Sequence, residues 1–444
     1  MRQLFGTDGI RGVAGEFPLN RETAFAVGVA LGQWVAGRHS NPEVALGIDT
    51  RESGPWIAEH VAGGLEKEGV HARFAGLITT PGIAYVARTG PFSAGVIISA
   101  SHNPYRDNGI KVIDHSGFKL PDDQERGLEE RIFACLGSGQ APTAKALAAD
   151  QSLDRQYLNY LAATLPEGLE GMRMVVDGAH GSASYLAPEL LEQLGAAVEC
   201  IHCAPDGKNI NLNCGSQHLE SLRERVLATG ADLGVAFDGD ADRALFVSHS
   251  GKIVDGDAVL LLCALPLHTK GRLSEVVATV MSNLGLERAL KAHGIGLVRT
   301  AVGDKYVLEE MLRRNAPLGG EQSGHIIFRD YATTGDGMLT ALRVLEVMRG
   351  SGKDLDDLTA EMETYPQILV NVRVRERKPL EELQRVSAEV QRTEAEFGEA
   401  GRVLVRFSGT EPLARVMVEG PELNRVEFNA QAIAAAIRVE IGEA

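Results

Sequence analysis

The sequence lacks the features that mark membrane, secreted and nucleic-acid-binding proteins. Its longest apolar run, residues 258–267, is far shorter than the ~20 residues of a membrane-spanning helix and contains Pro266. The first twelve residues, MRQLFGTDGIRG, hold no apolar segment of signal-peptide length. Five cysteines in 444 residues are too few for a disulfide framework. A net charge of −16 does not suit nucleic acid or an anionic membrane, which are bound through clustered Lys and Arg. We therefore expect a cytoplasmic protein with reduced thiols and a small-molecule partner.

The cysteines also give little support for a zinc site. Cys200 and Cys203 form a CxxC pair, and Cys214 and His218 follow, so four potential ligands are present. However, Cys200 ends a predicted strand over residues 196–201, in which positions three apart point to opposite faces. No second CxxC or HxxxH follows. We therefore favour buried or half-buried thiols over zinc ligands.

The length and the alternation of elements predict several α/β domains. Chains of this length usually hold about three or four domains, and we find no repeat of fixed period. Apolar spacing predicts strands at 44–48, 70–74, 96–98, 110–113, 174–178, 197–201, 233–237, 276–280, 296–300 and 326–328. It predicts helices at 18–38, 56–68, 187–194, 219–229, 257–262, 284–293, 305–314 and 336–350. We expect the small residues of the first helix to pack closely on a sheet.

After Pro366 the pattern changes to half-exposed strands. Residues 368–375, 403–407 and 415–418 alternate apolar and polar side chains, and helices are predicted at 380–396 and 428–441. We therefore predict three successive α/β domains with mixed sheets and a C-terminal α+β domain. The predicted domains are 1–150, 151–254, 255–366 and 367–444.

A serine-rich turn follows the strand at 96–98. The turn runs from Ser99 through Ser101 to Asn103-Pro104, where regular structure stops, and Asp107-Asn108-Gly109 predicts a second turn before a strand that carries Lys111. A hydroxyl on a tight loop near a lysine suits transfer of a charged group. A plain hydrogen-bonded turn is the alternative. A Ser-His hydrolase is disfavoured, since neighbours in an extended segment point apart and no GxSxG elbow is present.

Three acidic residues follow the strand at 233–237. Asp238, Asp240 and Asp242 are spaced by two, so their carboxylates face one way if the segment is extended. Such a cluster repels itself unless a cation lies among the oxygens, and ligands without Cys or His favour Mg²⁺. A solvated Asx-rich turn and a calcium loop are the alternatives. The calcium loop would need a Glu near its twelfth position, but Arg243 and apolar residues follow.

Three further stretches complete a set of five. They are Gly6-Thr7-Asp8-Gly9-Ile10-Arg11-Gly12, Gly319-Gly320-Glu321-Gln322-Ser323-Gly324-His325 and Arg406-Phe407-Ser408-Gly409-Thr410-Glu411-Pro412. In this order and over nearly the whole chain, the five stretches closely resemble the α-D-phosphohexomutase superfamily. That resemblance implies four domains around a central cleft, with one motif per domain.

The resemblance also implies roles for individual residues. Ser101 matches the family's phosphorylated serine, and its phosphate would join Asp238, Asp240 and Asp242 as ligands of one Mg²⁺. Ser99 points the same way on a strand but lacks the motif position. Lys111 and Arg11 match the cations beside the phosphoserine, and His325 is a further acid/base candidate. Which of these three carries the proton stays open. A lysine in that role needs a lowered pKa, which we expect from burial beside another cation.

The remaining motif residues match substrate-binding positions. Glu321 and Ser323 match the loop that binds sugar hydroxyls, and we add Arg243 to the expected substrate-binding residues. Arg406, Ser408, Gly409 and Thr410, with Arg415, match the loop that binds the phosphate that is not reacting. Asp8 and Arg51 have no assigned role, and we expect them to be structural.

The implied activity is a phosphate shift between the two ends of a hexose. Phospho-Ser101 would give a 1,6-bisphosphate, which also acts as activator, and would then take back the other phosphate after the sugar turns round. The motifs resemble the branch that acts on glucosamine phosphates and feeds amino-sugar nucleotide and cell-wall precursor synthesis. A phosphomannomutase or phosphoglucomutase, a phosphosugar phosphatase and a non-catalytic phosphosugar binder are the alternatives. We expect a phosphosugar partner and neither nucleic acid nor membrane; a single copy and a homodimer both stay open.

Overall fold

The chain forms two compact units. The computed structural model describes residues 4–6, 8–37, 41–408 and 412–443. The first unit holds residues 1–281 and 297–359, and the second holds 282–296 and 360–444.

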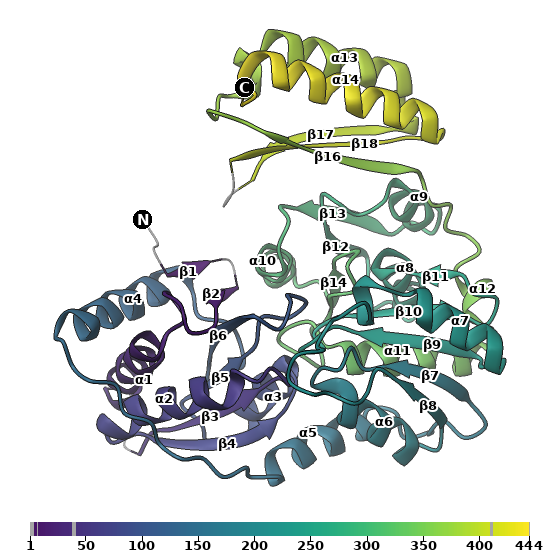
Figure 1. Ribbon diagram of the computed structural model, residues 1–444. Helices are drawn as coiled ribbons and strands as arrows, with labels where there is room; N and C mark the ends of the chain where they lie inside the picture. Colours follow the sequence, from purple (N-terminus) through teal and green to yellow (C-terminus); the bar gives the residue numbers. More distant parts are fainter. Residues whose placement is uncertain (1–3, 7, 38–40, 409–411, 444) are drawn as a thin grey trace. The chain divides into compact units, whose positions relative to one another are not determined.

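A six-stranded mixed sheet begins the first unit (Figure 1). Its order is β1-β2-β6-β5-β3-β4, with β3 parallel to β4 and β5 and the other pairs antiparallel. The strands are β1 (Phe5–Gly6), β2 (Gly9–Val13), β3 (Glu43–Ile48), β4 (His71–Leu77), β5 (Ala94–Ile98) and β6 (Asp107–Asp114). The helices are α1 (Arg21–Ala36), α2 (Gly54–Lys67), α3 (Thr80–Thr89) and α4 (Asp122–Gly137). The predicted turn at 107–109 is wrong, because these residues already pair with β2.

Helix α1 packs against helix α2, which corrects the expectation that its small residues face a sheet. A Cβ built on Gly28 would lie 2.0 Å from the carbonyl oxygen of Val61, and one on Gly32 would meet the side chain of Glu68 at 2.7 Å. Both contacts are with α2. The glycines therefore allow the two helix backbones to approach closely.

A five-stranded sheet follows, in the order β11-β10-β9-β7-β8. Its strands are β7 (Arg173–Asp177), β8 (Ala197–Ile201), β9 (Leu233–Phe237), β10 (Ala244–Ser248) and β11 (Ile253–Val254). Its helices are α5 (Ser152–Ala163), α6 (Ala183–Gln193), the 3₁₀ turn η1 (Gly215–Gln217) and α7 (Glu220–Thr229). Strand β9 is parallel to β7 and antiparallel to β10. The acidic residues 238–242 form the loop between β9 and β10.

A four-stranded sheet follows, in the order β13-β12-β14-β15, and residues 321–325 form the loop between β14 and β15. Its strands are β12 (Glu275–Thr279), β13 (Gly296–Thr300), β14 (Leu318–Gly320) and β15 (Ile326–Phe328). Its helices are α8 (Gly256–Thr269), α10 (Asp304–Arg314), α11 (Gly337–Ser351) and α12 (Leu355–Leu358). Helix α8 runs beyond the predicted residues 257–262 and includes Pro266. Residues 256–264 are all buried, so tertiary packing outweighs the local effect of the proline.

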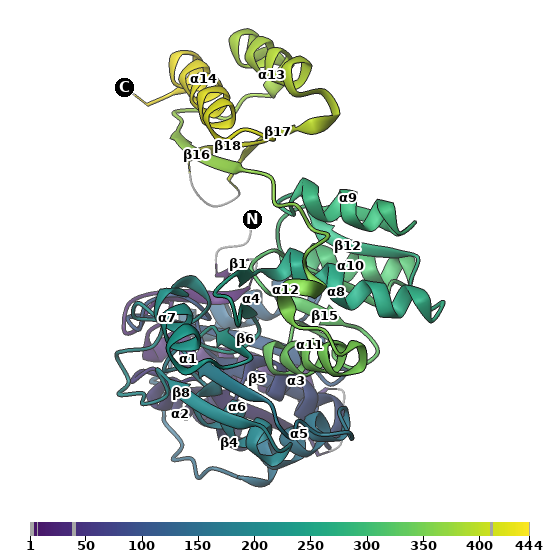
Figure 2. The same ribbon diagram turned by 90° about the vertical axis from the view of Figure 1, so that its right-hand side faces the viewer.

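The second unit is a three-stranded antiparallel sheet with helices on one face (Figures 1 and 2). The sheet order is β16-β18-β17, with β16 (Gln367–Arg373), β17 (Arg402–Phe407) and β18 (Leu413–Glu419). Helices α13 (Gln384–Phe397) and α14 (Leu423–Ile441) cover that face, and the unit also contains α9 (Leu284–Ala292) and the 3₁₀ turns η2 (Leu380–Glu382) and η3 (Gly398–Ala400). Strand residues Val372, Val416 and Val418 pack on Ile433 and Ile437 of α14. The predicted α/β class with a small C-terminal α+β domain is confirmed.

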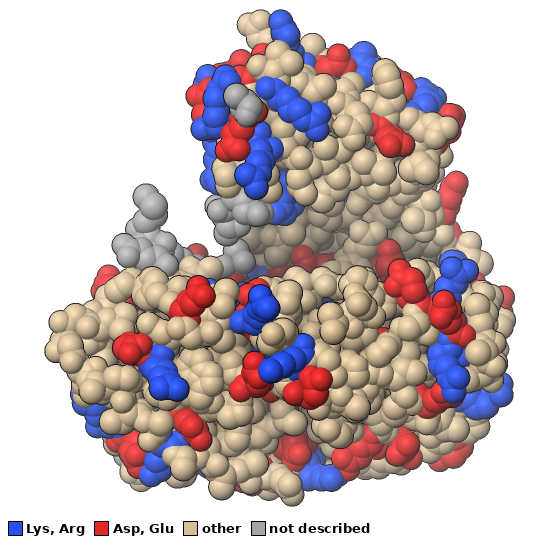
Figure 3. Space-filling view, viewed as in Figure 1, with Lys and Arg blue, Asp and Glu red and all other residues tan. Residues whose placement is uncertain are grey.

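Buried charges are the informative exceptions on this chain. Lys, Arg, Asp and Glu are interspersed over the face seen in Figure 3, as expected for solvated side chains. In contrast, Asp49, Arg51, Lys111, Asp238 and Asp240 are at most 2% exposed. Buried charges need partners, so the contacts of these residues locate the candidate site. No helix in the described ranges is long and apolar enough to cross a membrane.

Candidate active site

Ser101 lies in a tight loop after β5. Its φ is 53°, in the left-handed region, and the residue is 1% exposed. Its hydroxyl donates to Oδ2 of Asp238 at 2.5 Å, which joins the serine loop to the acidic loop. Ser99 does not point the same way as Ser101, because the segment is a turn rather than a strand. Its Oγ accepts from the backbone N of Ser101 at 3.0 Å and donates to Asp49 at 2.6 Å.

Arg51 fixes the backbone of this loop. Its guanidinium donates to the carbonyl oxygens of Ser101 at 3.1 Å and Asn103 at 2.5 Å, and pairs with Asp49. Asn211 reaches the same two carbonyls, at 2.9 and 3.2 Å, from the loop after β8. Arg51, expected to be structural, thus supports the candidate nucleophile directly. The motif order gave no signal for this contact, since it joins residues 50 positions apart.

The three aspartates converge through a turn rather than an extended segment. Ala241 has φ 54°, and its N donates to the carbonyl of Asp238 at 3.1 Å. Oxygens of Asp238, Asp240 and Asp242 nevertheless lie within 4.8 Å of one another, and all three residues are buried. Burial, followed by the charges of Asp242 and Asp240, raises the pKa of Asp238 well above its usual value. The predicted cluster is present, although the reason given for its convergence is wrong.

Two oxygens of this cluster fit a cation. Oδ1 of Asp240 and Oδ1 of Asp242 are buried and accept no hydrogen bond among the described residues. The other oxygen of Asp240 accepts from Thr80 at 2.5 Å and from Lys111 at 2.9 Å. Carboxylate oxygens without sulfur or imidazole in the set suit a hard divalent ion.

Two carboxylates hold Lys111, and the nearby charge of Arg11, which would lower the pKa of Lys111, does not outweigh them. Nζ of Lys111 lies 2.9 Å from Asp240 and 3.0 Å from Asp8, and the side chain is 2% exposed. Burial alone would lower the pKa of Lys111, but Asp240 and Asp8 outweigh it and raise the pKa above its usual value. The expected lowered pKa is therefore wrong. Asp8 also pairs with Arg11, so it is part of the site.

The loop of residues 321–325 is fixed against the acidic loop. The N of Ala244 donates to the carbonyl of Gly324 at 3.1 Å, and Gly324 has φ 91° with a Cβ position only 2.4 Å from the carbonyl of Ala244. Glu321 accepts from the N of Gly303 at 3.1 Å. Oγ of Ser323 is buried and finds no hydrogen-bond partner in the described part of the chain. This oxygen is available to a bound hydroxyl.

His325, the last residue of this loop, and Arg243 both lie beside Asp242 of the acidic cluster. Nδ1 of His325 is 3.6 Å from Asp242, and its Nε2 accepts from the N of Gly335 at 3.0 Å. Nε of Arg243 lies 3.7 Å from Asp242. Burial would lower the pKa of Arg243, but Asp242, Asp238 and Glu321 raise it above its usual value. The structure thus brings both predicted residues to the acidic cluster.

The predicted phosphate loop belongs to the second unit. Arg406 on β17 stands directly opposite Arg415 on β18. Burial and the charge of Arg415 lower the pKa of Arg406, and like charges placed opposite each other repel unless an anion joins them. Ser408 is buried, and its N donates to the carbonyl of Leu413 at 2.8 Å. Gly409 and Thr410 lie outside the described residues.

The four residues considered above as potential zinc ligands do not come together as one group among the described residues. All five cysteines are free thiols. Cys214 lies with Asp177 and His202, not with the predicted Cys200, Cys203 and His218, in the groups of potential ligands found among the described residues. Nδ1 of His202 is 3.0 Å from Asp177, so an ion pair accounts for this group.

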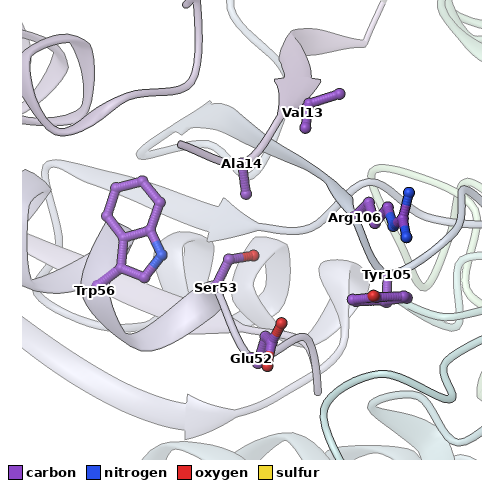
Figure 4. A pocket seen from close by; sticks show the side chains of 7 residues that line it. All are labelled: Val13, Ala14, Glu52, Ser53, Trp56, Tyr105 and Arg106. Carbon is purple, nitrogen blue, oxygen red and sulfur yellow. The ribbon is translucent and has the colours of Figure 1, made fainter. Parts of the chain in front are cut away.

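A separate cavity of about 390 Å³ lies in the first α/β domain. Figure 4 shows Trp56 on one side of it and Tyr105 and Arg106 on the other, with Glu52 and Ser53 below. It contains neither Ser101 nor an aspartate of the cluster. We therefore do not place the chemistry there.

Family profiles match almost the whole chain. The matches are phosphoglucomutase/phosphomannomutase alpha/beta/alpha domain I at residues 2–135, domain II at 155–251, domain III at 255–365 and the C-terminal domain at 369–436. The serine loop, acidic loop, sugar loop and Arg406 fall in successive matches. The four-domain order implied by the motifs is therefore that of this family.

Known proteins agree over the full length. A curated phosphoglucosamine mutase from Solibacter usitatus is 60% identical over 444 residues and covers 100% of both chains. The crystal structure of a phosphoglucomutase/phosphomannomutase family protein from Burkholderia thailandensis shares the fold, with a TM-score of 0.82, 23% identity and 98% and 99% coverage. The structure of Aspergillus fumigatus N-acetylphosphoglucosamine mutase in complex with GlcNAc-6P and magnesium has a TM-score of 0.66, 18% identity and 98% and 96% coverage. The chain belongs to the phosphoglucomutase/phosphomannomutase family of the α-D-phosphohexomutase superfamily, among the phosphoglucosamine mutases.

Proposed function

We propose that this protein interconverts glucosamine 6-phosphate and glucosamine 1-phosphate. The observation that carries the proposal is the contact between Oγ of Ser101 and Asp238, inside a cluster with two buried carboxylate oxygens that accept no hydrogen bond among the described residues. The sugar is taken from the relative that is 60% identical over its full length. The product would feed amino-sugar nucleotide and cell-wall precursor synthesis. The free thiols suit the cytoplasm.

The proposed domains are 1–150, 151–254, 255–366 and 367–444. Each would contribute one part of the site: the phosphoserine loop, the metal loop, the sugar loop and the phosphate loop. The family profiles support this division, since each profile lies within one proposed domain.

Asp238, Asp240 and Asp242 would hold one Mg²⁺, with a phosphate oxygen on Ser101 as a further ligand. Two observations support this site. All of the potential ligands in the acidic cluster are carboxylate oxygens, and the buried Oδ1 atoms of Asp240 and Asp242 accept no hydrogen bond among the described residues. The ion would neutralise charge on the phosphoryl oxygens during transfer. The magnesium complex of the Aspergillus protein is consistent with this choice.

In the first transfer, a free sugar hydroxyl attacks the phosphorus of phospho-Ser101. The bond between phosphorus and Oγ breaks, a bond to the sugar oxygen forms, and the hydroxyl proton passes to the general base. His325 is favoured for this role over Lys111 and Arg11, because the raised pKa of Lys111 and the guanidinium of Arg11 keep both of those groups protonated. The product is a hexose 1,6-bisphosphate. Lys111 and Arg11 would also balance charge on the phosphoryl group.

The second transfer reverses these bonds at the other end of the sugar. The bisphosphate turns round, Ser101 takes the other phosphate, and the proton returns to the sugar oxygen that is released. Turning is required because one serine faces a sugar whose two phosphates lie at opposite ends. The bisphosphate would therefore act as both intermediate and activator.

The sugar and the distal phosphate would be held by two separate loops. Glu321, Ser323 and Arg243 would bind sugar hydroxyls, supported by the free Oγ of Ser323. The distal phosphate would bind Arg406, Arg415 and Ser408, together with Gly409 and Thr410. The opposed guanidiniums on β17 and β18 support this anion site.

A substrate panel tests the proposed function. Purified protein with Mg²⁺ and a trace of hexose 1,6-bisphosphate is mixed with glucosamine, glucose or mannose phosphates, and both sugar products and inorganic phosphate are measured. We expect the highest kcat/KM with glucosamine phosphates. Faster turnover of glucose or mannose phosphate would overturn the sugar assignment, and steady release of inorganic phosphate would favour a phosphatase.

A further inference from the structure

Lys119 joins two segments that carry different parts of the site. It lies in the connection between β6 and α4, and its Nζ is 2.5 Å from Oδ1 of Asp8 and 2.6 Å from Oδ2 of Asp304. Asp304 is the first residue of α10. The Lys119 side chain is 25% exposed and that of Asp304 is 19% exposed, so water screens this pair only in part.

These contacts belong to a ring in which acidic and basic side chains alternate. On one side, Asp8 contacts Lys111, and Lys111 contacts Asp240. On the other side, Asp304 lies 3.8 Å from Nε2 of His325, whose Nδ1 faces Asp242. The ring therefore closes at Asp240 and Asp242, two aspartates of the acidic cluster.

The contact between Lys119 and Asp304 lies beside a cavity, which both residues line. This cavity of about 330 Å³ lies between the β6–α4 connection and α10, walled mainly by apolar side chains such as Ile113, Leu308 and Leu312. On its far side Thr333 donates to the carbonyl of Gly117 at 2.6 Å. Beside the acidic cluster, the contact of Lys119 with Asp304 bridges the two segments.

The start of α10 also contacts the loop of residues 321–325, which is the proposed sugar loop. Gly303, immediately before Asp304, donates its N–H to Glu321 at 3.1 Å. A shift of Asp304 therefore moves the carboxylate that the proposed function assigns to a sugar hydroxyl. Displacements of about 1 Å at a reacting centre can cost roughly 100-fold in rate.

We propose that Lys119 and Asp304 are positioning residues, which hold the sugar loop at a fixed place relative to Ser101. The inference rests on the proposed function. Neither residue needs to touch the reacting phosphate: the pair sets where Glu321 presents the sugar. Lys305 and Asp122 provide a matched control, because they pair between α10 and the first residue of α4 with 29% and 50% exposed side chains, and neither is a member of the ring.

The test compares Lys119→Met, Asp304→Asn, the double variant, Lys119→Arg and Lys305→Met. Activity on glucosamine 6-phosphate is measured together with the slow release of phosphate from phospho-Ser101 without sugar. We expect Lys119→Met and Asp304→Asn to lower kcat/KM about 10- to 100-fold, mainly through KM, while phosphate release and Tm stay near wild type. The double variant should resemble the single ones, Lys119→Arg should recover most activity, and Lys305→Met should stay within about twofold.

The outcomes separate this inference from the proposed function. If the wild-type protein does not convert glucosamine phosphates, the proposed function fails first. If it does, and Lys119→Met and Asp304→Asn keep a wild-type KM, the positioning role is wrong. Parallel loss of Tm, phosphate release and turnover would also overturn it, since that pattern indicates a merely structural pair.

Discussion

The two serines of the loop after β5 have different hydrogen-bond partners. The hydroxyl of Ser101 faces Asp238, whereas the hydroxyl of Ser99 bridges Asp49 and the backbone N of Ser101. Ser101 alone is therefore placed to carry phosphate beside the acidic cluster. Ser99 orients the turn.

Substitution of the two serines tests this division. Ser101→Ala removes the phosphate acceptor, so turnover with glucosamine 6-phosphate should be nearly abolished. Ser99→Ala keeps the acceptor and loses hydrogen bonds of roughly 1–3 kcal/mol, so kcat should fall by a much smaller factor. Steady-state kinetics of both variants gives the ranking, and the reverse order would show that the wrong serine is assigned.

Asp336, which caps α11, makes stability depend on pH. Burial raises its pKa to about 6 from the usual 3.8, although hydrogen bonds from Leu339 and Tyr157 lower it. Between about pH 4 and pH 6 the unfolded carboxyl is charged while the folded one keeps its proton. The contribution of Asp336 is therefore present at low pH and lost as pH rises through about 6.

Asp336→Asn should remove this dependence while keeping the cap of α11. The pKa change corresponds to roughly 3 kcal/mol, so the Tm of the variant should gain on wild type as pH rises from 4 to 6 and then stay level. Thermal unfolding across this range measures the difference. Parallel Tm curves for the two proteins would contradict the assignment.

Motifs located the residues proposed to react but not the residues that contact and hold them. Ser101 and the three aspartates stand in short local patterns that specify their chemistry. Lys119, in contrast, contacts Asp8 and Asp304 across more than 100 positions of the sequence. No local pattern encodes such contacts, so sequence alone left Asp8 unassigned and did not single out the other two.

At the scale of elements, the close backbone contact between α1 and α2 is a strong packing constraint. Gly28→Ala would put a methyl group 2.0 Å from the carbonyl of Val61, which cannot move without shifting α2. We expect a loss of at least roughly 1–3 kcal/mol, seen as a lower Tm. Gly127→Ala on α4 is the control: its Cβ meets nothing within 4 Å, so Ala should stabilise by about 0.5–1 kcal/mol. Equal Tm changes would contradict the packing argument.

Most elements that combine apolar spacing with clear ends were predicted. The predictions failed where tertiary contacts decide, as at residues 107–109, which pair with β2 instead of turning, and in α8, which continues through Pro266. The acidic loop is a similar case. Its carboxylates converge because Ala241 turns the chain, not because alternate residues of a strand share a face.

At the scale of the molecule, the order of the four domains follows the order of the motifs. Helix α9 is the exception in the grouping of residues. It lies in the third predicted domain, yet it packs with the second unit, where Asn283 donates to the carbonyl of Tyr365 at 2.9 Å and the N of Leu284 donates to Glu419 at 2.8 Å. This grouping was not predicted, because an amphipathic helix does not indicate which neighbours it packs against.

Mass spectrometry of the intact protein during turnover tests the central claim most directly. We predict that active protein carries one phosphate, located on Ser101, and that a single addition of glucosamine 6-phosphate moves it to the sugar as the bisphosphate before it returns. A fully active preparation in which Ser101 never carries phosphate would contradict the account.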